Sequence, residues 1–190
     1  IYVTNTPGVL TESTADTAFA LLITAARRII ECDKFMREGK FIGWDPLLLL
    51  GMEMSGKTVG IIGAGRIGSA LARRCSGFNM KILYSNRNKN EYLENTFKAK
   101  KVSLKTLLQK SDFISIHVPL NKETYHLIGK KEIELMKKTA VFVNTARGEV
   151  VDEKELIKAL KSKKIFAAGF DVYEGEPNVN KELFKLDNVV

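Results

Sequence analysis

Three glycines at a strand-to-helix junction are the first residues whose spacing suggests chemistry. The apolar run Val59–Ile62 ends in Gly63-Ala64-Gly65-Arg66-Ile67-Gly68, and a helical pattern begins immediately. In this context we expect Gly63 to turn the chain sharply, Gly65 to let the backbone approach a phosphate, and Gly68 to pack the helix on the sheet. Free N–H groups and the dipole at the helix start attract a pyrophosphate. The spacing predicts dinucleotide binding, and the alternative is a tight turn without a ligand.

The end of the following strand bears on which dinucleotide binds. An acid at this place would accept a hydrogen bond from the ribose 2′-hydroxyl of NAD, but the sequence has Ser85-Asn86-Arg87 and no acid before Glu91. A hydroxyl, an amide and a guanidinium suit the 2′-phosphate of NADP, because arginine forms charge-assisted bonds to phosphate oxygens. The sequence therefore favours NADP. The alternative is that Arg87 is a loop cation that also tolerates NAD.

Charged residues follow two later strands, at the sheet edge where open α/β folds bind ligands. Arg147 comes shortly after the strand predicted at 140–144, and its guanidinium could bind the carboxylate of a substrate. It could equally pair with an acid at the next helix start, Asp152 or Glu153. The strand predicted at 167–170 is followed by Asp-Val-Tyr-Glu-Gly-Glu-Pro, a second acidic strand end.

These motifs occur together in one order and spacing. The chain contains Asn-Thr-Pro-Gly at 5–8, the glycine loop, Ile-His-Val-Pro-Leu at 116–120, Asn-Thr-Ala-Arg-Gly at 144–148 and Phe-Asp-Val-Tyr-Glu-Gly-Glu-Pro at 170–177. Over nearly its whole length the chain resembles the D-isomer-specific 2-hydroxyacid dehydrogenases. The end of the second strand and the closing segment 180–190 most resemble glyoxylate/hydroxypyruvate reductases.

The resemblance implies catalytic roles. Arg147 would hold the carboxylate of a 2-oxo acid and polarise its 2-oxo group. Glu176 would pair with a catalytic histidine, orient it and raise its pKa so that it can donate a proton near neutral pH. Asp171 would lie beside the nicotinamide carboxamide. His117 would form a wall of the cofactor site and would not be the proton donor.

The resemblance also implies a set of residues that line the cofactor groove. These are Gly63, Gly65, Arg66, Ile67, Gly68, Ser85, Asn86, Arg87, His117, Pro119, Thr124, Thr145, Ala146 and Asp171.

The catalytic histidine of the family follows the Asp-Asn-Val-Val segment, and this chain stops at Val190. His126 does not match that motif. We therefore expect residues 1–10 to be a hinge at the end of a substrate domain, and residues 11–190 to be the dinucleotide-binding domain. We also expect this chain to bind cofactor and to turn over little or no substrate alone.

Strand and helix patterns alternate regularly from Lys57 onward, which predicts a parallel sheet covered on both faces. We expect a Rossmann-type, doubly wound α/β fold with strand order 3-2-1-4-5-6. The predicted strands are 58–62, 81–84, a short one near Val102, 113–117, 140–144 and 167–170. The predicted helices after the glycine loop are 66–76, 104–109, 130–136 and 152–162.

A long helix and an irregular segment precede this pattern. Apolar residues recur at helical spacing from about Thr11 to Glu38, with Thr11 or Ser13 as the predicted cap and Gly39 as the end. The 39–56 loop holds Trp44, either an interface anchor or a plug on the core, and a leucine run at 47–50 predicted to be packed. The resemblance implies a homodimer contact through the helix and this loop; the alternative is that the helix simply packs on its own sheet.

Composition limits the other possibilities. Of 190 residues, 45% are hydrophobic and 27% charged, which is typical of soluble globular proteins. The formal charge of +8 comes from scattered lysines without interleaved stacking aromatics, so we expect no nucleic-acid partner. We expect no membrane partner either, since no apolar run is long enough to span a bilayer. Cys32 and Cys75 have no metal-ligand spacing, and two thiols without a signal segment suggest the cytoplasm.

Rival functions remain. One is a phosphoglycerate, lactate or formate dehydrogenase on the same scaffold. Another is a regulatory module that senses nucleotides without catalysis, although a carboxylate clamp and an acid placed to tune a histidine argue against it.

Overall fold

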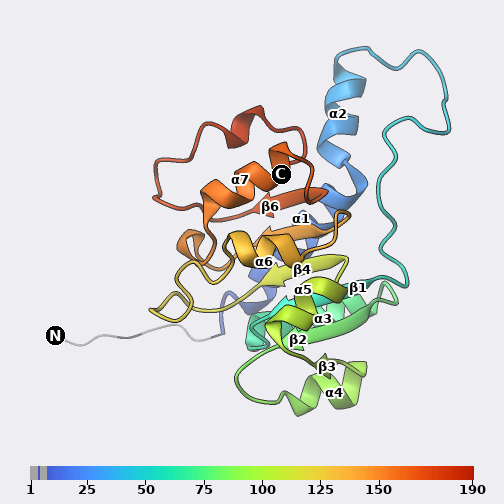
Figure 1. The fold of residues 1–190 in the computed structure, drawn as a ribbon. Coiled ribbons are helices and arrows are strands. Elements are labelled where there is room, and N and C mark those ends of the chain that lie inside the picture. Colours follow the sequence, from blue (N-terminus) through green and yellow to red (C-terminus); the bar gives the residue numbers. More distant parts are fainter. Residues whose placement is uncertain (1–3, 5–7) are drawn as a thin grey trace.

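The computed structural model describes residue 4 and residues 8–190, and its centre is a parallel sheet (Figure 1). The sheet order is β3-β2-β1-β4-β5-β6, which confirms the predicted doubly wound topology. The strands are β1 (Thr58–Ile62), β2 (Lys81–Ser85), β3 (Lys100–Lys101), β4 (Phe113–Ile116), β5 (Val141–Asn144) and β6 (Ala167–Phe170). The opening segment 1–3 and most of the predicted hinge lie outside the described residues.

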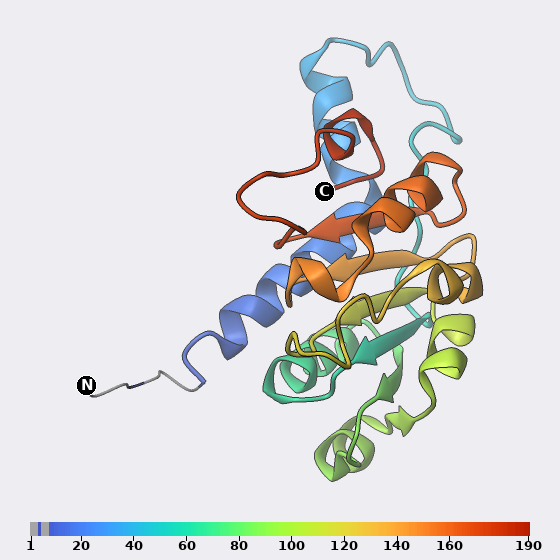
Figure 2. The same ribbon diagram turned by 60° about the vertical axis from the view of Figure 1, so that its left-hand side comes forward.

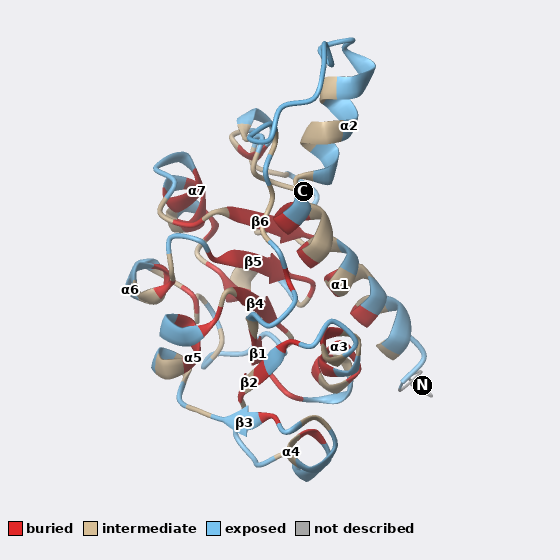
Figure 3. Cartoon of the chain, turned by 90° about the vertical axis from the view of Figure 1, so that its right-hand side faces the viewer, coloured by how far each residue is buried: buried red, intermediate tan, exposed pale blue. Residues whose placement is uncertain are grey.

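Helices cover both faces of the sheet (Figure 3). One face carries α1 (Thr11–Arg27), α3 (Arg66–Ser76) and α4 (Glu91–Phe97), and the other carries α5 (Leu104–Lys110), α6 (Lys130–Leu135) and α7 (Glu153–Lys161). Because successive strand side chains point to opposite faces, Val141 and Val143 enter the first core and Phe142 enters the second. Every residue of β4, β5 and β6 is buried, which fixes the sheet as a rigid platform.

The last residues of the chain extend this sheet. The N–H of Ala168 donates to Asn188 O at 3.0 Å, and the N–H of Phe170 donates to Val190 O at 2.9 Å. The segment therefore lies parallel beside β6. The chain also has two short 3-10 helices: η1 (Gly148–Val150) follows β5, and η2 (Leu183–Lys185) precedes this last segment.

Helix α4 is an element that the sequence analysis missed. Asn90 caps it, since its side chain accepts a hydrogen bond from the N–H of Leu93 at 3.1 Å. Asparagine followed by acidic residues in the first turn is a helix-start signal, and Glu91 and Glu94 supply those acids. The signal was therefore present in the sequence.

The predicted single helix from Thr11 to Glu38 is wrong, because the chain breaks at Arg28, which has φ +56° in the left-handed region. A second helix, α2 (Ile29–Arg37), follows. The N–H of Met52 donates to Ala26 O at 2.8 Å, and a Cβ on Gly51 would lie 2.7 Å from that oxygen. The returning loop thus takes an acceptor that a continuous helix would use. The predicted cap is also wrong, since Leu10 occupies the N-cap and no side chain caps the helix.

The 39–56 loop is irregular, as predicted. Its first part stands with α2 away from the body of the sheet (Figures 1 and 2), whereas Met54 near its end is 3% exposed and packs in the core. Its leucine run is not packed: Leu47 is 76% exposed and Leu50 is 56% exposed. Trp44 is 84% exposed, so it does not plug this chain's core. Within the described residues no helix is long and apolar enough to cross a membrane.

Candidate functional site at the carboxyl edge of the sheet

Gly63 turns the chain off β1, as its place in the motif predicts. Its φ is +94°, and a Cβ there would lie 2.6 Å from His117 O. Its N–H donates to Ser85 O at 2.9 Å, which joins the ends of β1 and β2. A side chain at Gly63 would therefore be strained and would also push the β4 end away.

The other two glycines shape the start of α3. A Cβ on Gly68 would lie 2.3 Å from Gly63 O, so only glycine lets this helix pack so closely on the turn. A Cβ on Gly65 would meet nothing within 4 Å, and Gly65 is exposed at the N-cap. The first N–H groups of this helix lack intrahelical partners, so open backbone donors face the space beside Gly65. The geometry fits a bound pyrophosphate.

A cavity of about 460 Å³ adjoins this helix start, and its lining includes Gly65, Arg66, Ser69 and Asn90. Asn90 holds the glycine loop in place, because its Nδ2 donates to Ala64 O at 2.8 Å and to Ser69 Oγ at 3.1 Å. Ile67 is half-buried in the first turn of the helix. Asn90 is thus a site residue that the sequence analysis missed together with α4.

The end of β2 presents Arg87 to solvent. Asn86 is half-buried, and its Nδ2 donates to Asn88 O at 3.1 Å within the turn. The Arg87 guanidinium lies 3.4 Å from Glu123 Oε2, and both side chains are about four-fifths exposed. The Glu123 carboxylate, from the loop after β4, therefore lies beside the end of β2, where the sequence itself has no acid. No local pattern could have indicated this, since the two residues lie on separate loops.

Two buried polar atoms at neighbouring strand ends have no partner within the described residues: His117 Nδ1 and Thr145 Oγ1. The other ring nitrogen, His117 Nε2, lies 2.9 Å from Ser115 Oγ. Burial lowers the pKa of His117 to about 4, so the ring is neutral at pH 7. A neutral ring suits a wall of a binding site and cannot serve as an imidazolium acid there.

Pro119 and Thr124 form a turn after β4. Thr124 Oγ1 donates to Pro119 O at 2.6 Å, and the Thr124 N–H donates to Asn121 Oδ1 at 3.0 Å. These bonds fix the course of the loop that carries Glu123. Pro119 is exposed and Thr124 is half-buried at this edge.

Asn144 presents Arg147 at the end of β5. It is 1% exposed, its Nδ2 donates to Arg147 O at 2.9 Å, and its Oδ1 accepts from the Ala146 N–H at 2.9 Å. Arg147 itself is exposed, and its Nη1 donates to Ala146 O at 2.6 Å. Asn144 is a positioning residue that sequence analysis quoted within a motif but gave no role.

Arg147 makes no ion pair with any residue of the described chain, including the two acids considered as rivals. Asp152 caps α7 by accepting from the Glu155 N–H at 3.2 Å. Glu153 accepts from the Glu174 N–H at 3.2 Å. The guanidinium therefore remains available to an anionic ligand.

Asp171 and Glu176 lie on the loop after β6. Asp171 is exposed, and its N–H donates to Asn144 O at 3.1 Å. Glu176 is also exposed, and its Oε1 accepts from the Tyr173 N–H at 2.7 Å. The loop is therefore fixed to β5 at its start and folds back on itself at Glu176.

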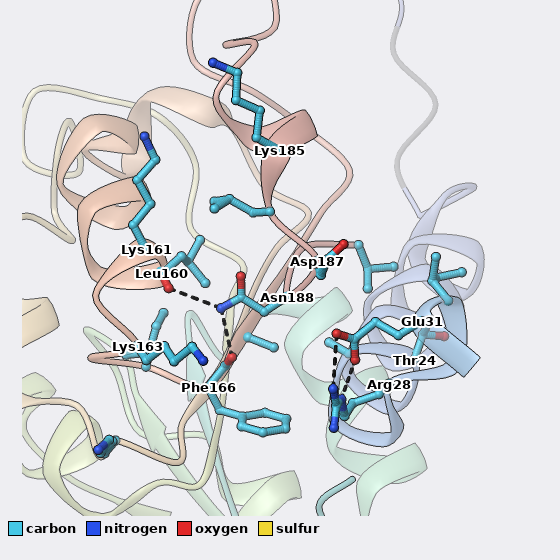
Figure 4. A pocket seen from close by; sticks show the side chains of 17 residues that line it. Thr24, Arg28, Glu31, Leu160, Lys161, Lys163, Phe166, Lys185, Asp187 and Asn188 are labelled. Atoms are coloured by element: carbon cyan, nitrogen blue, oxygen red, sulfur yellow. Dashed lines mark hydrogen bonds and ion pairs between the residues drawn. The ribbon is translucent and has the colours of Figure 1, made fainter. Parts of the chain in front are cut away.

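A larger cavity, about 610 Å³, lies elsewhere, beside α2 at the amino end of β6 (Figure 4). Figure 4 shows the Arg28–Glu31 ion pair on one side and Asn188 on the other. The Asn188 Nδ2 donates to Phe166 O at 3.1 Å and Leu160 O at 3.3 Å. Nothing in its lining belongs to the predicted cofactor or catalytic residues, so size does not mark the functional site here.

Known proteins share both the sequence and this geometry. The chain is 58% identical over its whole length to the glyoxylate reductase of Thermococcus litoralis, and it spans 59% of that relative. A crystal structure of a glyoxylate reductase from Paecilomyes thermophila superposes with a TM-score of 0.90 and 42% identity, covering all of this chain and 57% of that one.

Other solved structures carry cofactors. D-lactate dehydrogenase with NAD+ from Lactobacillus jensenii matches with a TM-score of 0.89 and 34% identity, over 100% of this chain and 60% of that one. An acyclic imino acid reductase in complex with NADPH and D-Arg matches with a TM-score of 0.84 and 33% identity, over 95% of this chain and 56% of that one.

The family comparison covers most of the chain. Residues 19–190 match the D-isomer specific 2-hydroxyacid dehydrogenase, NAD binding domain. The order of the sheet agrees with the Rossmann-like fold of the solved relatives. The chain therefore belongs to the D-isomer-specific 2-hydroxyacid dehydrogenases, through their NAD-binding domain.

Proposed function

We propose that this chain is the cofactor-binding part of a glyoxylate/hydroxypyruvate reductase. The observation that carries the proposal is Arg147, which a buried asparagine presents at the sheet edge without an ion-pair partner in the described chain. A free guanidinium beside a dinucleotide site suits a small 2-oxo acid, because its fork matches a carboxylate. The names of relatives such as the Thermococcus litoralis enzyme support the same substrate class.

Different residues of this chain bind the cofactor and the substrate. The glycine loop and the first turn of α3 would hold the pyrophosphate of a nicotinamide cofactor, which would supply or accept the hydride. Arg147 binds the carboxylate of the 2-oxo acid and polarises the 2-oxo oxygen. Pro119, Thr145, Ala146 and Asp171 line the groove beside it.

Proton transfer needs a histidine that Glu176 orients. His117 does not suit this role, since its pKa of about 4 leaves it unprotonated at neutral pH. His126 does not suit it either, because its ring bonds to Glu174 and not to Glu176. We propose that the donor belongs to the part of the natural protein outside this chain, and that the chain alone turns over little substrate.

We propose NADP(H) as the preferred cofactor, with NAD(H) as the alternative. The exposed Arg87 supports a 2′-phosphate, whereas Glu123 at 3.4 Å supports a ribose hydroxyl. We give Arg87 more weight than Glu123, because Arg87 lies two residues after β2 while Glu123 comes from a separate loop. Among the solved neighbours both NAD+ and NADPH occur.

We also propose a cytoplasmic homodimer that contacts its partner through α1, α2 and the 39–56 loop. No residue of α2 is buried in the single chain, and Ile42 and Trp44 are 100% and 84% exposed. Large apolar side chains that are this exposed suggest a surface that a partner covers. The free thiols of Cys32 and Cys75 suit a reducing compartment.

The test uses the protein at its natural length. Oxidation of NADPH and NADH is followed spectroscopically with glyoxylate, hydroxypyruvate and pyruvate as acceptors, and with 3-phosphohydroxypyruvate for the phosphoglycerate-type alternative. The proposal expects the highest kcat/KM with glyoxylate or hydroxypyruvate. Preference for pyruvate would favour a lactate-type enzyme, and tight cofactor binding without turnover would favour a regulatory module.

A further inference from the structure

His126 joins loops from different strands at the carboxyl edge. Its ring Nε2 lies 2.8 Å from Glu174 Oε1, although the two residues are 48 positions apart in the sequence. Its backbone N–H donates to Glu149 O at 2.8 Å. The loop after β4 is therefore bound both to the loop after β5 and to the loop after β6.

Glu174 continues the connection into α7. Its Oε2 accepts from the Glu153 N–H at 3.3 Å, while its own N–H donates to Glu153 Oε2 at 3.2 Å. Glu153 is only 6% exposed, and burial together with the nearby Glu174 charge raises its pKa. These two reciprocal hydrogen bonds hold Glu174 against the start of α7.

The same segment holds the proposed partner of the catalytic histidine. Glu176 follows Glu174 by two positions, and its Oε1 accepts from the Tyr173 N–H at 2.7 Å. On the opposite side, a Cβ on Gly148 would lie 2.0 Å from Tyr173 O, so the backbones are in contact next to Arg147. Movement at Glu174 would thus be transmitted to both catalytic candidates.

We propose that His126 is a positioning residue for hydride transfer: its bond to Glu174 holds the 173–176 segment, and with it Glu176, at the right place relative to Arg147. This inference rests on the proposed function, because it assumes the roles of those two residues. Since Nε2 faces a carboxylate, it carries a proton and donates whether the ring is neutral or charged. The bond to Glu174 therefore does not require a charged ring.

The backbone offers a rival explanation for a histidine at this position. His126 has φ +49°, in the left-handed region that histidine, asparagine and aspartate adopt more readily than most residues. Its ring also stacks on Tyr125, with centroids 4.1 Å apart. If conformation alone mattered, asparagine would replace histidine without loss, although its side chain is too short to reproduce the bond to Glu174.

The experiment measures kcat, substrate KM and NADPH Kd of the natural full-length protein and of the variants His126→Asn, His126→Gln and Glu174→Ala. Lys131→Gln, an exposed change on α6, is the matched control. We expect His126→Asn and Glu174→Ala each to lower kcat by about tenfold, because small displacements of catalytic groups cost this much or more. His126→Gln retains an N–H donor of suitable reach and should recover most of the rate. NADPH Kd should stay unchanged in all of them, and combining His126→Asn with Glu174→Ala should add little further loss.

Several results would overturn the inference. Wild-type kcat in His126→Asn would assign the residue to backbone conformation alone. Equal losses in the Asn and Gln variants, or a weakened NADPH Kd, would indicate general disruption of the edge. If the wild-type protein reduced none of the 2-oxo acids, the proposed function would fail and this inference with it. An active wild type with unaffected variants would overturn only the role of His126.

Discussion

The backbone of Gly148 lies directly against the backbone of Tyr173. A Cβ at Gly148 would stand 2.0 Å from both the carbonyl carbon and the oxygen of Tyr173, closer than any real contact. This approach joins the loop that carries Arg147 to the loop that carries Glu176. The two catalytic candidates therefore have a fixed spacing that depends on a glycine.

Replacement of Gly148 by alanine should separate the two loops. Because the clash is with backbone, the loops must shift, and we expect a loss of about 1–3 kcal/mol in the free energy of unfolding. Catalytic rate should fall further than stability alone explains. Gly77→Ala is the control, since Gly77 has a helical φ and lies far from this edge. Denaturant unfolding and steady-state kinetics measure both effects, and a silent Gly148→Ala would show that the contact is not needed.

Arg147 should be essential for turnover but not for cofactor affinity. Arg147→Gln removes the charge that binds and polarises a 2-oxo acid, so we expect kcat/KM to fall by about 10²–10³-fold. Arg147→Lys keeps the charge but loses the two-pronged geometry, and it should recover only part of the rate. Lys154→Gln, an exposed change on α7, serves as the control. Unchanged kcat/KM in Arg147→Gln would exclude the proposed carboxylate clamp.

Cofactor preference should depend on Arg87 and Glu123 in opposite directions. Arg87→Asp should weaken NADPH binding by about tenfold or more and leave NADH binding equal or tighter. Glu123→Gln removes the carboxylate 3.4 Å from the guanidinium and should strengthen NADPH binding by about two- to fivefold, because the exposed pair contributes little. Fluorescence titrations of the wild type and both variants with each cofactor give the dissociation constants. Tighter binding of NADH by the wild type, with no change in either variant, would refute the NADP assignment.

The neutral, half-buried His117 should make the fold sensitive to acid. Its pKa falls from 6.5 to about 4 on folding, so between these pH values the unfolded chain binds more protons than the folded chain. The contribution is fully present above about pH 6.5 and is lost as the pH falls toward 4. His117→Asn removes this titration.

Urea unfolding of both proteins at pH 7 and pH 4.5 tests the prediction. The wild type should lose about 2 kcal/mol more than His117→Asn between the two conditions, and carboxylates common to both cancel in the comparison. Equal losses would mean that the folded protein admits a proton to this ring.

The parts of this molecule that sequence predicted are those determined locally. The glycine loop and five of the six strands follow from apolar runs and from residues within a few positions of each other. The exceptions are β3, which consists of two exposed lysines, and the order of the sheet, which was predicted from the alternation of strands and helices. The break at Arg28 could not be predicted this way, because a loop that returns after position 50 takes the Ala26 carbonyl. The exposed leucines at 47–50 were misplaced for a similar reason: apolar character alone does not say whether a core or a partner covers a segment.

The residues of the candidate site likewise comprise some that local motifs predicted and some that they did not. Gly63, Gly68 and Arg147 were identified by their motifs, whereas the side chains that hold them were not. Asn90, Glu123 and the His126–Glu174 pair act across different loops, so their roles depend on the tertiary fold. Asn144 was part of a recognised motif, but its positioning role follows only from its hydrogen bonds to the backbones of Ala146 and Arg147.

The most direct test of the account is hydride transfer from NADPH to glyoxylate and hydroxypyruvate by the natural full-length protein, beside its Arg147→Gln variant. We expect turnover by the wild type, loss of that turnover in the variant, and the same NADPH Kd in both. Absence of turnover in the wild type would refute the proposed function, and equal rates in the two proteins would refute the role of Arg147.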